Sequence, residues 1–510
     1  MGFVSYGFPL LVGGLLLVYY LLPRERRWWA LLVGSWGFYA LCGLRYVPFL
    51  AFVTGSVYLG ARWIGALEEK RKGLLAAHPD YTKGEKKALK AAFGRKKRGV
   101  FLLALLLNLG LLGGCKYLGL FEALSPGELL PLGLSFYMFQ ALGYLIDVYR
   151  GKYPPEKRFF RFALFVGFFP QLVQGPISRF DGLEKTLFAG GDLRGGAVGR
   201  GLLRALWGYF KKMVIADRLS AAVTACFAVT PAAGSATALG MGLYAIRLLC
   251  DFTGGMDIAL GTAGMFGVLP MENFDAPYLS GSLAEYWTRW HISMGSWFRD
   301  YIFYPLSVCK PMLRLNTALR RRFKAGFFTR VPLYGAILAT WLATGLWHGA
   351  GWNFPLWGLT NGLLLILSQE LEPAFARFHS RFPALEKSRG WEIFRIGRTF
   401  LLLCCIRLWD CFTAPGPAAE AFLSLFFRPD FAALGTLWPT LSMTGFDWAA
   451  VLLGLCPVVW LDIRKKQGKP LMPKSQGAVW ALIALLLVLT LTFGVYGSGY
   501  RAADFIYGRF

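Results

Sequence analysis

The chain has 510 residues, of which 55% are hydrophobic and only 16% are charged. Soluble domains carry about 25% charged residues, so this composition excludes a soluble enzyme, a disordered chain and a fibrous protein. It predicts an all-α, polytopic membrane protein, because the length accommodates roughly a dozen spans of about 20 residues each. The formal net charge of +26 is expected to reflect basic residues pooled in cytoplasmic loops, so no nucleic-acid partner is predicted.

The N-terminal part predicts three membrane spans, at about residues 7–22, 28–42 and 46–66. The first apolar run has no basic residue before it and no small-residue cleavage site after it. It is therefore interpreted as a span and not as a removable signal peptide. Residues 67–98 carry eleven basic residues against four acidic ones and are predicted to form a cytoplasmic basic loop. This orientation places the N-terminus outside the cytoplasm.

Further hydrophobic segments alternate with charged links along the rest of the chain. Residues 310–330 hold seven basic residues and no acidic one, which predicts another cytoplasmic link. The same alternation places the C-terminus outside, and about 11 to 13 hydrophobic helices are expected. No internal repeat and no separate soluble part is visible, so residues 1–510 are predicted to form a single membrane-embedded domain. The segments lie near 99–119, 129–148, 331–369 (a hairpin), 395–411, 447–463 and 477–497.

Between residues 160 and 305 the apolar runs are interrupted by polar and charged side chains. Ionisable groups at membrane depth are costly, so we expect them to line an enclosed or watery cavity, unless some of them lie in loops. The Gly254-Gly255 pair and Pro270 are expected to break helices. Asp251 and Asp257 are six residues apart, so they do not share a helical face and do not form a carboxylate pair for acid–base chemistry. The interrupting residues include Gln171, Gln174, Arg179, Arg247, Asp251 and Asp257.

Residues 284–301 predict one amphipathic helix with aromatic anchors, suited to the membrane interface or to a re-entrant position. On this helix His291 is expected on the apolar face, beside Trp287 and Phe298. A neutral histidine in such a place needs a hydrogen-bond partner. It is either a packing residue or an active-site residue. The polar face gathers Glu285, Arg289, Ser296, Arg299 and Asp300.

His348 lies in the segment Gly345–Trp352, at the predicted turn of the apolar hairpin. The glycines there allow backbone or substrate to approach closely. An imidazole in a dry, aromatic setting is suited to act as a general base, and a packing histidine in a polar helix interface is the alternative. His78 and His379 have polar and charged neighbours and are expected in solvated loops. None of the nine cysteines shows metal-ligand spacing, so no metal site is predicted.

Several of these segments together resemble a known family. Tyr286-Trp-Thr-Arg-Trp-His-Ile-Ser293, continuing through Trp297-Phe-Arg-Asp-Tyr301 to Tyr304-Pro-Leu306, is similar to the signature of membrane-bound O-acyltransferases. The resemblance is greatest to the bacterial branch that contains alginate O-acetyltransferases, and it runs in order over a core of about residues 100–370. Further matching segments are Pro131–Gln140 with Asp147–Arg150, Phe169–Arg179, Asp251–Asp257, Glu272–Tyr278 and Gly345–Trp352.

The resemblance implies a fold of transmembrane spans and re-entrant helices around a central funnel. It implies that His348 matches the catalytic histidine of the family and that His291 matches its second active-site residue. Two departures weaken alginate itself as the acceptor: Ser307–Met312 replaces a Gly-Gly-Asn-Arg stretch, and Asn361 stands where many relatives have another histidine. The residues then expected to bind substrate are Arg289, Arg299, Asp300, Trp347, Trp352 and Asp251.

The leading hypothesis is an O-acyltransferase of the bacterial plasma (inner) membrane with no bound cofactor. An acyl thioester, most simply acetyl-CoA, would be the cytoplasmic co-substrate, and the acceptor would be a hydroxyl of an extracytoplasmic cell-envelope polysaccharide. The transfer would be direct or would pass through an extracytoplasmic partner acyltransferase. One alternative is D-alanyl transfer from an acyl carrier protein to teichoic acid. The other is a transporter or flippase, which predicts paired inverted repeats that the sequence does not display.

Overall fold

The computed structural model describes residues 2–118, 130–193, 196–323 and 325–496. Within these residues the regular structure is helical, and the only β-type pairing is an isolated antiparallel bridge between Phe274 and Trp290. Helices long and apolar enough to cross a membrane are present, which confirms the predicted all-α, polytopic membrane protein. These four helices are Leu44–Ala77, Lys83–Tyr117, Gly445–Lys466 and Gln476–Phe493.

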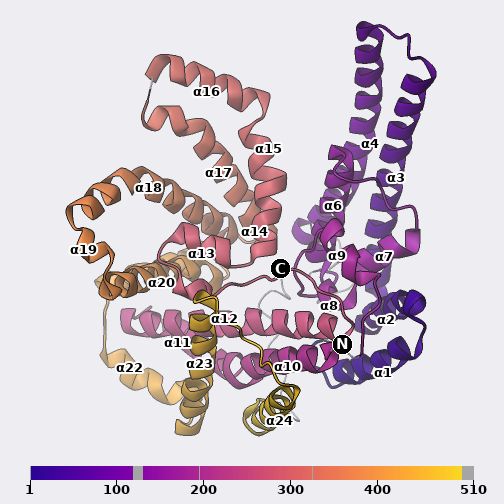
Figure 1. Cartoon of the computed structure of the whole chain (residues 1–510). Helices are drawn as coiled ribbons and strands as arrows, with labels where there is room; N and C mark the ends of the chain where they lie inside the picture. Colours follow the sequence, from indigo (N-terminus) through magenta and orange to yellow (C-terminus); the bar gives the residue numbers. More distant parts are fainter. Residues whose placement is uncertain (1, 119–129, 194–195, 324, 497–510) are drawn as a thin grey trace. The chain divides into compact units, whose positions relative to one another are not determined.

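The described residues group into two compact units. Figure 1 labels the helices of both by number. Unit 1 contains residues up to 205 together with 258–271, and unit 2 contains residues 206–257 together with those from 272 onward. Helices α10 (Ala197–Tyr209) and α12 (Gly234–Met265) contribute residues to both units. The single-domain interpretation of the sequence stays a prediction.

Unit 1 is built around α6, whose residues are almost all buried. Helices α3, α4 and α7 pack against it. Tyr19 of α1 ties this helix to the end of α12, because its hydroxyl donates to the Phe266 carbonyl oxygen at 2.8 Å. The spans predicted in the first 66 residues appear as α1, α2 and α3. The elements of unit 1 are α1 (Gly7–Leu21), η1 (Arg24–Arg26), α2 (Arg27–Cys42), η2 (Leu44–Tyr46), α3 (Val47–Ala77), α4 (Lys83–Tyr117), α6 (Leu134–Arg150), α7 (Phe159–Gly167), α8 (Phe169–Leu172) and α9 (Phe180–Leu187).

The prediction that residues 67–98 form a loop is wrong, because this stretch is helical except for a short turn. Helix α3 continues to Ala77, and α4 begins at Lys83. A capping box starts α4: the Thr82 hydroxyl accepts from the Glu85 amide, and the Glu85 carboxylate accepts from the Thr82 amide. The Lys, Glu, Ala and Leu residues of this stretch are strong helix formers, so the apolar helices continue into it as a charged helical hairpin. Its cytoplasmic location stays a prediction.

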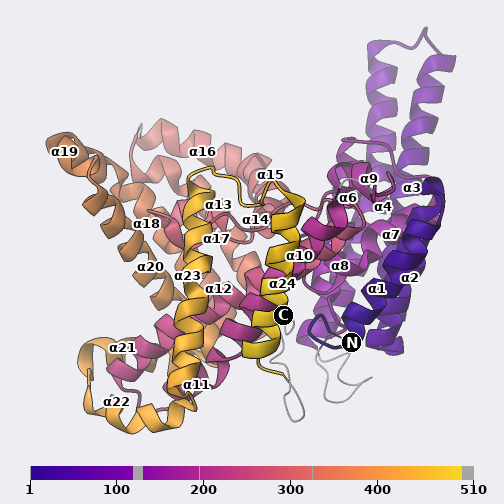
Figure 2. The ribbon, with the colours of Figure 1, turned by 60° about the horizontal axis from the view of Figure 1, so that its bottom comes forward.

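Unit 2 holds the C-terminal helices and the segments that carry both candidate histidines. Helices α17 and α18 pack along each other as a hairpin, and α20 packs on α18. The π-helical segment η3 packs against α23 and α24, which are yellow in Figure 2. The elements of unit 2 are η3 (Phe210–Ala216), α11 (Leu219–Phe227), η4 (Pro277–Leu279), α13 (Leu283–Arg289), α14 (Ile292–Phe298), η5 (Arg299–Phe303), α15 (Tyr304–Ser307), α16 (Lys310–Phe323), α17 (Phe327–His348), α18 (Asn353–Arg381), α19 (Pro383–Glu386), α20 (Arg389–Cys411), α21 (Pro415–Phe427), α22 (Ala432–Leu437), η6 (Trp438–Leu441), α23 (Gly445–Lys466) and α24 (Gln476–Phe493).

The hydrophobic segments predicted in the C-terminal part correspond to helices of unit 2. The hairpin near 331–369 is α17 and α18, and the segments near 395–411 and 447–463 are α20 and α23. The last segment corresponds to α24, which ends at Phe493. Met1 and residues 497–510 lie outside the described residues, so the extracytoplasmic placement of both ends stays a prediction.

Helix α12 runs unbroken through Gly254-Gly255, which corrects the prediction that this pair breaks a helix. The lack of a side chain at Gly254 instead allows α12 to pack closely against α10. A Cβ atom at Gly254 would lie 2.9 Å from the Gly208 carbonyl oxygen of α10. Small residues allow helix backbones to approach in this way. As a result Arg247, Asp251 and Asp257 lie on one continuous helix rather than in loops.

Gly358→Ala is expected to destabilise the α17–α18 hairpin. A methyl group at Gly358 would overlap the Trp341 carbonyl oxygen, and overpacking of this kind costs about 1–3 kcal/mol. Gly335→Ala is the matched control on the same hairpin, because its methyl group would meet only the end of the Met312 side chain, at 3.6 Å. Thermal unfolding of the detergent-solubilised protein should give a lower melting temperature for the Gly358 variant alone. Equal melting temperatures would contradict the packing described.

Candidate active site

The predicted single helix over 284–301 is wrong, because it is broken at Trp290 and His291. His291 adopts a left-handed backbone conformation, with φ of 48°. The cause is tertiary. Trp290 pairs with Phe274 in the isolated bridge, and the amide that follows His291 donates to the Asn273 carbonyl oxygen at 3.0 Å. Bonds to the neighbouring segment thus replace those of a continuing helix, and a left-handed residue persists only where its surroundings fix it.

His291 is fully buried and has the hydrogen-bond partner that the sequence predicts. The side-chain amide of Asn273 lies 3.2–3.3 Å from Nδ1 of His291. The Asn273 side-chain oxygen also accepts a hydrogen bond from the Ser293 amide at 2.9 Å. The centre of the Phe252 ring lies 4.9 Å from that of the His291 ring. His291 is outside the four candidate spans. Burial, and then the positive charge of Arg407, lower its pKa well below the ordinary value, so the imidazole is neutral at neutral pH.

His348 is the last residue of α17 and is also buried. Its ring centre lies 4.6 Å from that of Trp357 on α18 and 5.1 Å from that of Trp347. One turn earlier, a side chain at Gly345 would overlap the Phe354 carbonyl oxygen of α18. The sequence left open whether backbone or substrate approaches these glycines. At Gly345 it is the backbone of α18 that lies close.

Trp347 brings the two histidines into one site. The centre of this buried indole lies 6.2 Å from the His291 ring and 5.1 Å from the His348 ring. Phe298 of α14 lies 6.4 Å from the same indole. The two histidines, 57 positions apart by number in the sequence, thus share one aromatic neighbour in a setting that excludes water.

Five aromatic residues, here termed the aromatic wall, border this site. Trp287 contacts both Trp341 and Trp357, with ring centres 4.8 and 5.6 Å away. Asn361, the position that departs from the family pattern, accepts from Trp287 Nε1 at 3.2 Å and donates to the Trp357 carbonyl oxygen at 2.8 Å. This buried amide therefore links α13 to α18. The aromatic wall is formed by Tyr286, Trp287, Trp290, Trp341 and Trp357.

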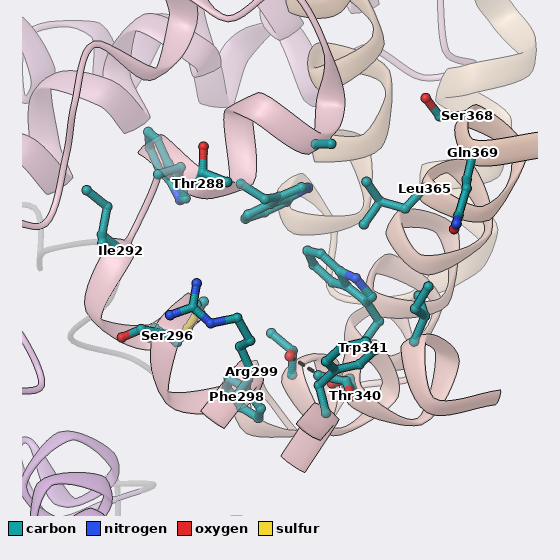
Figure 3. Close-up of a pocket in the computed structure, with 18 of the residues that line it drawn as sticks. Thr288, Ile292, Ser296, Phe298, Arg299, Thr340, Trp341, Leu365, Ser368 and Gln369 are labelled. Carbon is teal, nitrogen blue, oxygen red and sulfur yellow. Dashed lines mark hydrogen bonds between the residues drawn. The ribbon is translucent and has the colours of Figure 1, made fainter. Parts of the chain in front are cut away.

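A cavity of about 650 Å³ lies beside the aromatic wall (Figure 3). Apolar and aromatic side chains of α13, α14, α17 and α18 form most of its lining. Figure 3 shows Ser296 and Arg299 on one side of it and Ser368 and Gln369 on the other. Neither histidine is among the described residues that line it. The cavity adjoins the site, because Trp287, Trp290 and Trp341 of the aromatic wall also line the cavity.

Three of the residues predicted to bind substrate lie near the surface. Arg299 and Asp300 are neighbours on η5, and Nε of Arg299 donates to Oδ1 of Asp300 at 3.2 Å. Arg299 lines the cavity. Trp352 lies in the turn between α17 and α18 and is 78% exposed, in contrast to the buried Trp347.

Two further predicted residues have their charges engaged in ion pairs. Arg289 lies 3.0 Å from Glu285, one turn back on α13. Asp251 lies 2.6 Å from Lys212 of η3, which is also 2.8 Å from Asp217. Neither Arg289 nor Asp251 lines the cavity. Their roles in substrate binding stay predictions.

The remaining two histidines lie elsewhere. His78 follows α3, is exposed and stacks on Tyr81 with ring centres 4.8 Å apart. His379 lies on α18, 3.6 Å from Glu386, so its expected place in a loop is wrong. Within the described residues no cluster of three or more His, Cys, Asp or Glu side chains is arranged to hold a metal ion.

Sequence reasoning missed two residues of the site. Asn273 belongs to the matching segment Glu272–Tyr278, but with Glu272 before it and Asp275 close behind, no local pattern distinguishes it from a polar loop residue. Arg407 lies in a predicted span and is buried, with Asp410 2.7 Å away. A charged residue at membrane depth was the available signal in that case.

Known proteins resemble the chain over most of its length. No family model matches it. It is 32% identical over 480 residues to the probable alginate O-acetylase AlgI of Pseudomonas aeruginosa, covering 90% of this chain and 81% of that protein. It is 29% identical over 328 residues to a peptidoglycan O-acetyltransferase of Helicobacter pylori, covering 57% and 59%. It is 26% identical over 251 residues to a teichoic acid D-alanyltransferase of Streptococcus thermophilus, covering 46% and 56%.

These relatives define the class of the protein as a membrane-embedded acyltransferase. The helices long enough to span a membrane and the two buried histidines on either side of Trp347 agree with this class. The chain belongs to the membrane-bound O-acyltransferase family, as its motifs predicted.

Asn273→Ala removes the side chain that binds both His291 and the Ser293 amide. Leaving buried polar groups without a partner costs about 1–3 kcal/mol, so a lower melting temperature and slower acyl transfer are expected. Asn316→Ala is the control, because the Asn316 side chain accepts an exposed hydrogen bond from Arg320, away from the site. Thermal unfolding and transfer assays measure both effects. Wild-type stability and activity in Asn273→Ala would show that Asn273 does not hold His291.

Proposed function

We propose that the protein transfers an acetyl group from a cytoplasmic thioester to a hydroxyl of an extracytoplasmic cell-envelope polysaccharide. The relative named alginate O-acetylase supports this, because the match covers 90% of the chain. The relative named peptidoglycan O-acetyltransferase supports the same chemistry on another envelope polymer. Acetyl-CoA is the simplest donor. The placement in a bacterial plasma membrane, with the donor side cytoplasmic, is part of this proposal.

The observation that carries the mechanism is the buried His348 at the end of α17, joined to His291 through Trp347. In the proposed step His348 takes the proton of the attacking hydroxyl. The hydroxyl oxygen bonds to the acyl carbon, the C–S bond breaks, and the proton passes to the leaving thiolate. The neutral imidazole of His291 is suited to donate a hydrogen bond to the oxyanion that forms on the way. The aromatic surroundings exclude water, which would otherwise hydrolyse the thioester.

The basic helix α16 supports a cytoplasmic donor that carries phosphate. Its last turn contains Arg320, Arg321 and Arg322, and no acidic residue lies on this helix. Clustered positive charge attracts phosphate groups and raises their local concentration. The cavity beside the aromatic wall is proposed to accommodate part of a substrate, with Arg299 and Asp300 at its edge. The acetyl group then leaves on the outer face, directly onto the polymer or through a partner acyltransferase.

A second candidate is D-alanyl transfer from an acyl carrier protein to teichoic acid. The match to a relative named teichoic acid D-alanyltransferase favours it, although that match covers only 46% of the chain. The transporter hypothesis is set aside, since the chain is an acyltransferase. Mass spectrometry of envelope polymers from a deletion strain distinguishes the two candidates, because acetyl esters disappear in one case and D-alanyl esters in the other.

His348→Ala is expected to lower acyl transfer at least about 100-fold, because general base catalysis contributes roughly 10²–10⁴-fold. His78→Ala is the matched control, since this histidine is exposed and lies outside the site. Ester content of the envelope polymers in complemented cells measures the effect, with protein level in the membrane checked by immunoblot. Normal ester content in the His348 variant would remove this residue from the mechanism.

A further inference from the structure

Arg407 of α20 is a buried cation enclosed by the aromatic wall. Its guanidinium carbon lies 5.2 Å from the ring centre of Trp290, 5.6 Å from that of Trp357 and 5.7 Å from that of Trp287. Nη2 donates to the hydroxyl oxygen of Tyr286 at 3.0 Å. One arginine therefore contacts four of the five wall residues.

Asp410, one turn further along the same helix, also binds the Arg407 guanidinium. Nη1 of Arg407 donates to Oδ2 of Asp410 at 2.7 Å. The two side chains are only 5% and 9% exposed. Withdrawing such a pair from water is costly, and pairing offsets this cost only with additional bonds in good geometry. Stability alone is therefore a weak explanation for a buried pair at this place.

The contacts of Arg407 lead directly to both histidines. Trp357, one of the rings that it contacts, lies 4.6 Å from the His348 ring. Trp290, a second ring that Arg407 contacts, immediately precedes His291, which has a left-handed backbone conformation. Trp290 also forms the backbone bridge to Phe274 that breaks the helix there. Trp287 borders the cavity. Trp357 therefore bounds the space in which the His348 imidazole lies, and Trp290 takes part in the bridge that sets the turn at His291.

We propose that Arg407 is a positioning residue of the acyl-transfer site, which acts through Trp290 and Trp357 to fix the orientation of His348 and the turn at His291. It does not touch the reacting atoms. Asp410 in turn orients the guanidinium. The proposal rests on the function proposed above, in which these two histidines carry out the transfer.

Arginine suits this role for a reason that lysine does not share. Its planar guanidinium presents several donors in a fixed fork and stacks on aromatic faces, whereas an ammonium is a compact point charge. One guanidinium can bind Tyr286 and Asp410 while facing indoles. Lysine keeps the charge but loses the fork, so Arg407→Lys should fold and still leave the wall less ordered.

The test compares Arg407→Lys and the double variant Arg407→Met/Asp410→Asn, which leaves no unpaired buried charge, with Arg389→Met. Arg389 is an exposed arginine at the start of the same helix and is the matched control. Purified full-length proteins in liposomes are assayed for transfer of radiolabelled acetyl from acetyl-CoA to isolated envelope polymer. In the double variant kcat should fall about 10- to 100-fold, the size expected for a misplacement of about 1 Å. The KM for acetyl-CoA should change little.

A second measurement does not depend on turnover. Diethyl pyrocarbonate modifies accessible imidazoles, and mass spectrometry quantifies its addition at His348, with the exposed His78 as internal reference. Both Arg407 variants should be labelled faster at His348 than the wild type, and Arg389→Met should not. Trp357→Phe combined with Arg407→Lys should lose less activity than the product of the single effects, because both act through the same ring.

The outcomes separate this proposal from the function on which it rests. Wild-type kcat in both Arg407 variants, or unchanged labelling of His348, overturns the positioning role, and so does an equal loss in Arg389→Met. If the double variant does not fold, Arg407→Lys decides alone. If the wild type transfers no acetyl group, the proposed function fails, and the labelling still decides whether Arg407 positions His348.

Discussion

Burial of polar groups among apolar side chains is the constraint on which the site depends. A polar group in such a place needs a partner, because its surroundings provide no water to replace a missing bond. In unit 2 these partners come from distant parts of the sequence. Asn273 binds His291, and Arg407 of α20 binds Tyr286 of α13. The bonds that satisfy burial therefore also determine the geometry of the site.

The same burial sets the chemistry of the site. Removal from water keeps the imidazole of His291 neutral, and it places both histidines among aromatic rings that exclude competing water. Electrostatic interactions are stronger in such a medium than in water. A hydrogen bond that orients a buried side chain therefore stabilises a charge developing beside it more strongly than the same bond would at the protein surface. Trp347, which both histidines share, joins the two imidazoles in one such environment.

Most of the helical framework could be predicted from hydropathy, because apolar segments of sufficient length have few alternatives in a membrane. The hairpin of α17 and α18, with His348 at its turn, is an example. Predictions failed where charge or flexibility was taken to exclude a helix. The basic stretch 67–98 is helical because its residues are good helix formers and its second helix has a capping box. Gly254 does not break α12, because it faces a neighbouring backbone.

The sequence by itself determined the membrane class and the main helices and singled out two candidate histidines, since composition, hydropathy and local motifs carry that information along the chain. The tertiary structure alone decided that the segment 284–301 breaks at His291, because the competing backbone hydrogen bonds join Ile292 to Asn273 and Arg289 to Asp275. It also decided that Arg407 lies against the aromatic wall. Both depend on contacts between residues far apart in sequence, which no local pattern of side chains contains.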